Sequence, residues 1–528
     1  MPVLKNGEWE APFWGSPKSF ITGQDMLGMQ NTSIATYSAL LPGLTNLTRR
    51  IRYYGFYMWL LEQYAETEGK VSVSAFRQFI RRGELIFAFM MADTHTEENG
   101  IVGISYAQNH LKQNSNPINI AAGADRKNEN TYWKYSAGAF GQYYQGALSA
   151  IGLIAPSENE SRIPVCTADY GRKLAKSFES TIAKDTRDRY IDAIKEGKVT
   201  REELTDFGKE FSTTAIKPHS PEWEFYIDML FGKDLPTVKA PSGHTKFRVE
   251  TILLYLGYLK KSKQFESAGS FPVSFHYRLW KEEPFIGYTA YTGWHYYALN
   301  EFAHYSLETI LWACLVQLKN EGPVSLSFFI ESFTDKTLTA LDTISSSYGD
   351  ARTLAFASFA ENLYTTGFTP SQYTDNIKHT NEDKPYNGIA YALHVLAQIY
   401  WHDKTEISKL NTYVRKHGMC RDGDVTELLK WVEKNENLPI PQFFRKLLLQ
   451  HVINRHIEVA MRKMRNRNEN TIKFTLEDNI LSITGKTMEP VWTGPRLKSL
   501  HQFLVDLKLV RNNTLLPLGE NLLREHLK

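Results

Sequence analysis

Cysteine is scarce in this chain, and its scarcity narrows the class of protein. Only 3 of the 528 residues are cysteines. They are Cys166, Cys314 and Cys420, which lie too far apart for the Cys-x-x-Cys pairs of zinc ribbons and redox proteins. A disulfide framework is excluded at this density. We therefore expect a protein of a reducing compartment, the cytoplasm.

Long apolar runs and a secretion signal are missing as well. A membrane helix needs about 18 or more consecutive apolar residues, and no window of the sequence reaches that length. The first ten residues, MPVLKNGEWE, lack the basic and then apolar order of a signal peptide. We expect no membrane association.

The chain has no excess of charge of one sign. It contains 61 Lys and Arg against 58 Asp and Glu, a net charge of +3. Any surface that binds nucleic acid must therefore be a local patch. The apolar fraction of 42% is ample for folded cores, and 528 residues exceed what one core usually organises. Several domains are the expectation.

Three common catalytic motifs are absent too. The sequence contains no phosphate-binding Gly-x4-Gly-Lys-Ser/Thr loop, no Gly-x-Ser-x-Gly elbow and no His-Glu-x-x-His helix. Nucleotide hydrolysis and the frequent hydrolase mechanisms lose support accordingly. We expect no cofactor and lean towards a protein that is not an enzyme.

The most informative stretch that is present is 293–319. Its apolar residues occupy nearly every face of a helix, which indicates a helix surrounded by protein. Glu301, His304 and Glu308 interrupt it at positions i, i+3 and i+7, so they share one stripe. A buried carboxylate needs a cation beside it, because an unpaired buried charge is too costly to keep.

We predict that an arginine neutralises this stripe and that no metal is bound. Arg49, Arg50 and Arg52 are the arginines we expect to supply the positive charge, and phosphate binding is the alternative role for them. The Glu301-Phe-Ala-His304 step resembles the Glu-x-x-His unit of carboxylate-bridged di-iron bundles, which use that unit twice. The sequence has no second copy, so the stripe is predicted to hold helices together.

Helical periodicity dominates the rest of the chain and predicts a mainly α protein. Gly197 is expected to form a turn within a charged helical stretch, and the segments 107–131 and 370–388 are expected to be loops. A hairpin is predicted at 471–483, where apolar residues alternate on both sides of Glu477-Asp-Asn479. The predicted helical segments are 46–64, 72–92, 180–212, 246–262, 293–319, 351–366, 389–401 and 442–468.

Two stretches share one layout, at 139–178 and at 494–526. In each, a helix ends at Gly152-Leu-Ile154 or Lys508-Leu-Val510, a polar insert follows, and a glycine, Gly171 or Gly519, lies in the first turns of the next helix. This layout resembles the winged-helix domains of prokaryotic regulators and other chromosome-associated proteins. The resemblance implies a helix able to enter the major groove and a wing at the DNA backbone. The same fold also serves as a protein-docking or dimerising unit.

Basic residues near the C-terminal copy predict contacts with double-stranded DNA. Cations beside a hairpin suit phosphate contacts, although a solvated helix end with cations near its C-terminal dipole is the alternative. The N-terminal copy, with Arg172, Lys173 and Lys176, is the weaker of the two. The predicted nucleic-acid-binding residues are Arg462, Lys463, Arg465, Arg467, Arg496 and Lys498.

Catalytic alternatives stay open at this stage. Arg445 and His451 have the Arg-x5-His spacing that resembles helical HEPN-type ribonucleases, with Lys446 where that family usually has a small polar residue. Glu301, His304 and Glu308 are the other catalytic possibility. The set Asp188, Asp192, Glu196 and Lys198 superficially resembles a metal nuclease, but a charged helix predicts a solvated face instead.

The fold prediction is a mainly α, multi-domain helical protein with two winged-helix-like units that carry short β-hairpins. Its regions are an N-terminal helical domain at 1–180, a helical middle domain at 181–438 and a C-terminal region at 439–528. Two terminal winged-helix-like units around a helical middle resemble the kleisin subunits of chromosome-organising ATPases. The general architecture also resembles that of uncharacterised proteins of bacterial antiviral defence.

The functional prediction is a non-catalytic nucleic-acid-binding and scaffolding subunit of a bacterial complex, associated with antiviral defence or with a chromosome or plasmid. A partner protein or ATPase subunit would accompany it. A helical nuclease-type effector and a protein-interaction module without nucleic acid are the alternatives. The oligomeric state is open.

Overall fold

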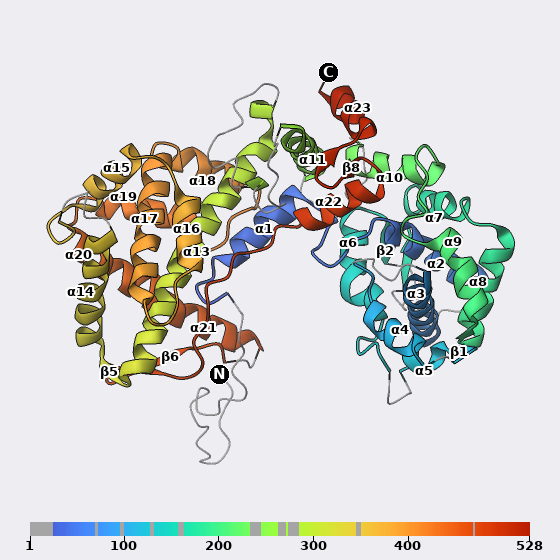
Figure 1. Ribbon diagram of the computed structural model, residues 1–528, viewed down its shortest axis with the longest axis horizontal. Helices are drawn as coiled ribbons and strands as arrows, with labels where there is room; N and C mark the ends of the chain where they lie inside the picture. The colour runs from blue at the N-terminus through green and yellow to red at the C-terminus, as the bar shows by residue number, and fades with distance from the viewer. Residues whose placement is uncertain are drawn as a thin grey trace, which may run out of the picture. The chain divides into compact units, whose positions relative to one another are not determined.

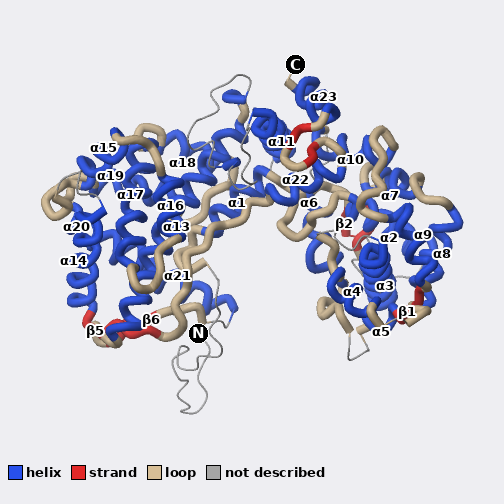
Figure 2. Tube along the Cα trace, viewed as in Figure 1, coloured by secondary structure: helices blue, strands red, loops and turns tan. Residues whose placement is uncertain are grey.

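The computed structural model shows two compact units, and each is described by itself. Unit 1 comprises Met1–Thr36, Pro272–Leu279 and Thr292–Thr493, and unit 2 comprises Tyr37–Phe271, Trp280–Tyr291 and Gly494–Lys528. The structure describes residues 25–68, 72–94, 100–113, 115–126, 131–156, 163–232, 244–261, 271–272, 285–344, 350–467 and 470–527. Both units are mainly helical, as the sequence predicts, and their few strands are short (Figures 1 and 2).

The elements of unit 2 come mostly from the first half of the chain and are completed by the last 35 or so residues. Its helices and strands are α2 Arg52–Glu68, α3 Val73–Thr94, α4 Ile104–Leu111, β1 Ile118–Asn119, α5 Ile120–Ala124, η1 Phe140–Tyr144, α6 Gln145–Ala150, β2 Ile154–Pro156, β3 Pro164–Cys166, α7 Gly171–Glu179, α8 Lys184–Glu196, β4 Lys198–Val199, α9 Arg201–Phe211, α10 Pro221–Phe231, α11 His244–Lys261, η2 Phe285–Gly287, α22 Leu497–Asp506, β8 Val510–Arg511, β9 Thr514–Leu515 and α23 Pro517–His526.

The core of unit 2 is built on α2 and α3. Aromatic side chains of α2 pack against rings from other helices: Tyr53 lies 4.8 Å from Phe87 and 5.1 Å from Tyr144 between ring centroids, and Trp59 lies 5.2 Å from Phe211. Aromatic pairs at these separations add to the stabilisation from burial itself. The predicted helix at 46–64 is present from Arg52 onwards, because the residues before it form turns.

The elements of unit 1 lie in the second half of the chain, apart from α1. They are α1 Gln30–Leu40, α13 Thr289–Glu321, β5 Val324–Ser325, α14 Leu326–Ile344, α15 Phe356–Thr365, α16 Pro370–Lys378, α17 Pro385–Asp403, α18 Ile407–Lys416, α19 Val425–Asn435, α20 Ile440–Leu447, η4 Leu448–Ile453, α21 Asn454–Arg467, β6 Phe474–Glu477 and β7 Ile480–Ile483. The borders between the units fall inside α1 and in the first turn of α13.

Two helices form the core of unit 1. Between Ala290 and Leu318, α13 is buried at nearly every position, which confirms that it is surrounded by protein. The helix α17 is buried at most of its positions as well. One strand pair, β6 and β7, matches the predicted hairpin, with Asp478 and Asn479 at positive φ in a two-residue turn.

Unit 2 contains the repeated layout as two helix–hairpin–helix units, defined as α6-β2-β3-α7 and α22-β8-β9-α23. Each has an antiparallel strand pair between its helices. Two positions after the end of the first helix, each unit has a residue with positive φ, Gly152 at 76° and Lys508 at 60°. The next residue is a leucine whose amide donates back to the helix, over 3.0 Å for Leu153 and 2.9 Å for Leu509.

The two glycines of the layout occupy equivalent places. A Cβ added to Gly171 would stand 2.1 Å from the carbonyl oxygen of Leu153, and one added to Gly519 would stand 2.5 Å from that of Leu509. Both distances are shorter than any real Cβ contact, so only glycine lets the second helix approach the strand this closely. The repeat seen in the sequence is therefore a repeat of local backbone packing. Its assignment as winged-helix-like stays a prediction.

Two predicted loops contain helices. The stretch 107–131 includes the end of α4, the strand β1 and α5, and 370–388 includes α16 and the start of α17. Proline at the first helical position begins both α16 and α17, since its missing amide is unpaired there in any case. The boundaries predicted at 180 and 438 each fall within a unit, and the three-region division stays a prediction.

Candidate functional site

The polar stripe of α13 lies in the interior of unit 1. Glu301 and His304 are fully buried, and Glu308 is 2% exposed. The helix places the three side chains on successive turns, as their spacing predicts. The contacts around these three side chains show whether they serve only to hold helices together or form a binding site.

Glu301 is held by hydroxyl and amide donors. Its carboxylate accepts from the backbone amide of Thr493 over 2.6 Å and from the hydroxyls of Thr493 and Ser33. Ser33 belongs to α1 and also accepts from the side-chain amide of Asn300 over 2.9 Å. Donors of this kind stabilise an ionised carboxylate and fix its orientation.

His304 lies between two carboxylates. Its Nε2 is 3.1 Å from Oε1 of Glu308, and its Nδ1 is 3.7 Å from Oε1 of Glu301. Burial acts to lower the pKa of His304, but Glu308 and Glu301 together raise it well above its usual value. Despite these short separations neither ring nitrogen is aligned for a hydrogen bond with a described residue.

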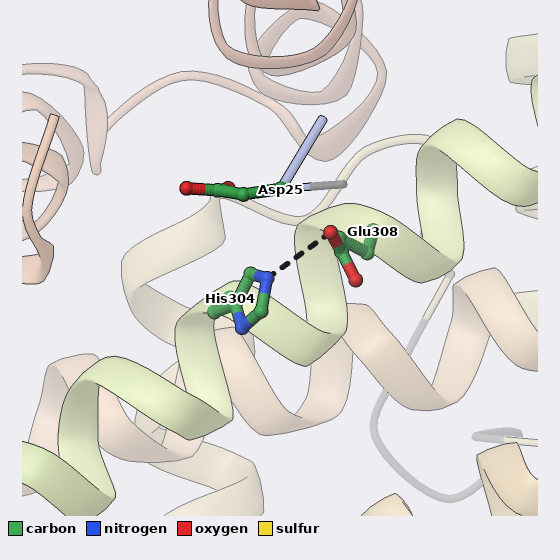
Figure 3. A group of neighbouring side chains, drawn as sticks. All are labelled: Asp25, His304 and Glu308. Carbon is green, nitrogen blue, oxygen red and sulfur yellow. Dashed lines mark ion pairs between the residues drawn. The ribbon is translucent and has the colours of Figure 1, made fainter. Parts of the chain in front are cut away.

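A third carboxylate, Asp25, joins the cluster from the segment before α1. It is 8% exposed. One potential metal-ligand atom from each of Asp25, His304 and Glu308 lies within 4.8 Å of the other two. Figure 3 shows the three side chains gathered beside α13. One oxygen of Asp25 accepts the amide of Asn31 over 3.2 Å, whereas Oδ1 is buried without a hydrogen-bond partner among the described residues.

The helix α21 fixes the backbone around Asp25. Side chains of this helix bind three consecutive carbonyl oxygens: Lys463 donates to that of Asp25, His456 lies 3.2 Å from that of Met26, and Arg455 donates to that of Leu27 over 2.9 Å. Sequence reasoning missed Asp25, because its segment has no periodicity. The only signal was a run of basic residues on the facing helix.

A cavity of about 730 Å³ in unit 1 borders the cluster. Asp25 and Glu308 form part of its wall, together with Tyr305 and Trp312 of α13. Residues of 377–382 and 487–491 line much of the remainder, and Lys378, Glu382 and Glu489 are the charged residues among them. The cluster therefore faces a space that can hold a small polar molecule.

The arginines expected to neutralise the stripe are engaged elsewhere, which corrects that prediction. Arg50 pairs with Asp506 at 3.0 Å, and Arg52 pairs with Glu222 at 3.0 Å; all four residues belong to unit 2. Arg49 is exposed. Buried carboxylates on α10 and α22 compete for these guanidinium groups, and such long-range pairing cannot be read from helical spacing.

The basic run on α21 has mixed surroundings. Arg462 lies 3.5 Å from Asp422, and Lys463 is bound to the carbonyl of Asp25. The side chains of Arg465 and Arg467 lie outside the described residues. The structure thus gives Lys463 a role in positioning the Asp25 backbone.

The other predicted nucleic-acid-binding residues lie in unit 2. Arg496 packs over the ring of Tyr37 at 5.1 Å and donates to the carbonyl of Leu41 over 3.3 Å and the hydroxyl of Ser38 over 2.9 Å. Lys498 is exposed near the start of α22. Of these two, only Lys498 presents its charge to solvent.

The ribonuclease-like pair is not brought into one cavity. His451 lines a second cavity of about 360 Å³ in unit 1, whereas Arg445 does not line it and pairs with Glu331. His451 lies in the π-helical stretch η4, whereas Arg445 lies in the preceding helix α20. Burial, together with nearby Arg455, lowers the pKa of His451 to about 4. His451 is therefore neutral, and its ring packs against that of Trp431 with 4.6 Å between the ring centroids.

The residues considered as a metal nuclease set form a solvated face, as predicted. Asp188, Asp192 and Glu196 of α8 and the adjoining Lys198 are all exposed.

Among the helices that the structure describes, none combines the length and the apolar composition that a membrane span requires.

Comparison with known proteins gives no assignment: no protein-family model, no curated protein and no solved structure matches this chain.

Proposed function

We propose that the protein is a nucleic-acid-binding scaffold whose two helix–hairpin–helix units contact the phosphate backbone of double-stranded DNA. The observation that supports this most is the repeat itself. Two stretches more than 300 residues apart in sequence build the same hairpin between two helices, with the same glycine approach to a leucine carbonyl. A duplicated module of this kind suits a function of contact with an extended partner.

Exposed cations supply the charge that the proposal needs. In the helix–hairpin–helix unit α22-β8-β9-α23, Lys498 lies near the start of α22 and Arg511 lies in the hairpin, and both are exposed. In the helix–hairpin–helix unit α6-β2-β3-α7, Lys173 and Lys176 are exposed on α7. Cations on a hairpin and at a neighbouring helix end are placed to meet phosphates rather than base edges.

The proposal concerns phosphate contacts and not base reading. Six of the ten residues of α22 are buried, so this helix has little free surface for a groove. Electrostatic contacts of this type release counterions, and the affinity then falls with salt by a slope of about 0.9 for each phosphate contact. The affinity should depend weakly on the DNA sequence.

The test is binding of a short DNA duplex at several salt concentrations, measured by fluorescence anisotropy. The variant Lys498→Glu/Arg511→Glu is expected to weaken binding and to reduce the salt slope by about 2, one unit for each lost contact. The matched control, Lys409→Glu/Lys434→Glu, changes the same net charge at exposed positions of unit 1 and should leave the slope unchanged. Absence of binding by the wild type at about 50 mM salt, or equal loss in both variants, would refute the proposal.

A further inference from the structure

Among the described residues of unit 1, the charges around His304 do not balance. Asp25, Glu301 and Glu308 bring three buried carboxylates together. In the part of the chain that the structure describes, the positive groups beside them are His304, if protonated, and Lys463, whose ammonium donates to the backbone carbonyl of Asp25. One negative charge thus remains uncompensated even with a charged imidazole, and a buried site of this kind is costly to maintain.

The geometry of the imidazole is that of a ligand and not of a proton donor. Nε2 stands 3.1 Å from a Glu308 oxygen, yet the two atoms do not form a hydrogen bond. Two ligand atoms that bind one metal ion at about 2.1 Å are roughly 3 to 3.5 Å apart, and no hydrogen atom lies between them. The separation therefore fits two ligands of one cation.

Asp25 offers the third ligand. Its Oδ1 is buried and has no hydrogen-bond partner among the described residues, and one oxygen of its carboxylate lies within 4.8 Å of ligand atoms of His304 and Glu308. Three side chains of α21 hold the backbone of 25–27 at its carbonyl oxygens. The unused oxygen is thus part of a segment whose position is fixed from outside the cluster.

Glu301 completes the arrangement from the other side of the ring. Its Oε1 lies 3.7 Å from Nδ1 of His304, without a hydrogen bond between them, while Nε2 lies 3.1 Å from Glu308. A carboxylate on the second ring nitrogen orients a metal-bound histidine and raises its basicity. Because Ser33 and Thr493 hold Glu301 in place, it can act as this orienting group.

We infer that Asp25, His304 and Glu308 bind one divalent first-row transition metal ion, with Glu301 as the positioning residue behind His304. One imidazole and two carboxylates favour Zn²⁺, Mn²⁺, Fe²⁺ or Co²⁺ over Ca²⁺ and Mg²⁺, which prefer oxygen ligands alone. A divalent ion with a neutral imidazole and Lys463 brings the local charge to zero. Three protein ligands leave coordination positions open, and the neighbouring cavity gives a small ligand access to them.

The inference is independent of DNA binding, because it concerns unit 1 and the proposed phosphate contacts lie in unit 2. The purified, tag-free full chain is stripped with a chelator, and the binding of Zn²⁺, Mn²⁺, Co²⁺ and, without oxygen, Fe²⁺ is then titrated. The metal content is measured by mass spectrometry and the Co²⁺ site by its visible absorption. One equivalent per chain is expected, with a rise in the thermal unfolding midpoint.

Substitutions separate ligands from neighbours. Asp25→Asn and Glu308→Gln are each expected to weaken metal binding at least 100-fold, and Glu301→Gln to weaken it by about 10- to 100-fold, the range for groups behind a ligand. Glu489→Gln, a carboxylate in the wall of the same cavity, is the matched control and should bind as the wild type does. The metal-free variants are first checked for native unfolding curves.

Two results would overturn the inference. One is a wild type that takes up no stoichiometric Zn²⁺, Mn²⁺, Fe²⁺ or Co²⁺ and gains no thermal stability from them. The other is metal binding that Asp25→Asn and Glu308→Gln leave as tight as in the wild type. If a ligand variant does not fold, X-ray absorption of the wild-type Zn²⁺ or Co²⁺ complex decides: one imidazole among oxygen ligands supports the site, and any other ligand set rejects it.

Discussion

Alanine at Gly171 and Gly519 tests whether the two helix–hairpin–helix units are packed in the same way. Alanine normally stabilises a helix by about 1 kcal/mol relative to glycine. Here the added Cβ would meet the Leu153 carbonyl oxygen at 2.1 Å in one unit and the Leu509 carbonyl oxygen at 2.5 Å in the other. The usual gain should therefore become a loss.

The magnitude follows from what must move. The Leu153 oxygen accepts the amide of Thr167 over 3.0 Å, and the Leu509 oxygen accepts that of Leu516 over 2.9 Å. Relieving the overlap costs about 1 to 3 kcal/mol of packing strain and weakens a hydrogen bond worth about 1 kcal/mol. We expect a loss of about 3 kcal/mol for Gly171→Ala and of about 2 kcal/mol for Gly519→Ala.

Thermal unfolding followed by circular dichroism measures these losses. A domain of this size loses about 2 to 4 °C for each kcal/mol, so the Gly171→Ala midpoint should fall by about 6 to 12 °C. The control is Gly146→Ala in α6, where an added Cβ meets nothing within 4 Å and a small stabilisation is expected. If both test variants are as stable as the wild type, or if only one is destabilised, the equivalence of the two units is wrong.

Two further predictions concern buried charges and pH. Glu222→Gln removes the charge opposite the fully buried Arg52 and is expected to lower the free energy of unfolding in urea by about 3 to 5 kcal/mol. The double variant Arg52→Met/Glu222→Leu should lose less stability than Arg52→Met and Glu222→Leu lose when added together. Additive losses would contradict the pairing. Burial lowers the pKa of His394 to about 4, so the folded state binds fewer protons than the unfolded state between pH 4 and about 6.5, and stability is lost as the pH falls through that window, by about 3 kcal/mol. In His394→Phe this part of the acid loss should disappear from urea midpoints measured against pH, and an unchanged profile would assign it to other groups.

Local pattern was sufficient for much of the helical framework. The central helix at 293–319, the charged pair of helices around Gly197 and the hairpin at 471–483 all follow from spacing and turn residues close in sequence. Gly197 has a φ of 69° and caps α8, as a glycine between two helical patterns predicts. The equivalence of Gly171 and Gly519 was visible in sequence as well.

Long-range contacts were beyond the sequence. Arg50 and Arg52 face acids 456 and 170 residues away, and no spacing rule favours those acids over Glu301 or Glu308. Asp25 reaches the stripe only because α21 holds its backbone. The ligands come from two distant segments, and only the α13 segment has a spacing that marks it, so the sequence predicts the α13 part of the site and not Asp25.

The ion pair between Arg50 and Asp506 has a consequence for how the protein is made. Asp506 lies in the last tenth of the chain and its partner in the first, and both side chains are buried. During synthesis, the first 230 or so residues of unit 2 leave the ribosome long before α22 exists to cover that guanidinium. We therefore expect nascent chains that stop short of α22 to remain sensitive to protease in unit 2 and to depend on chaperones until the final helices arrive.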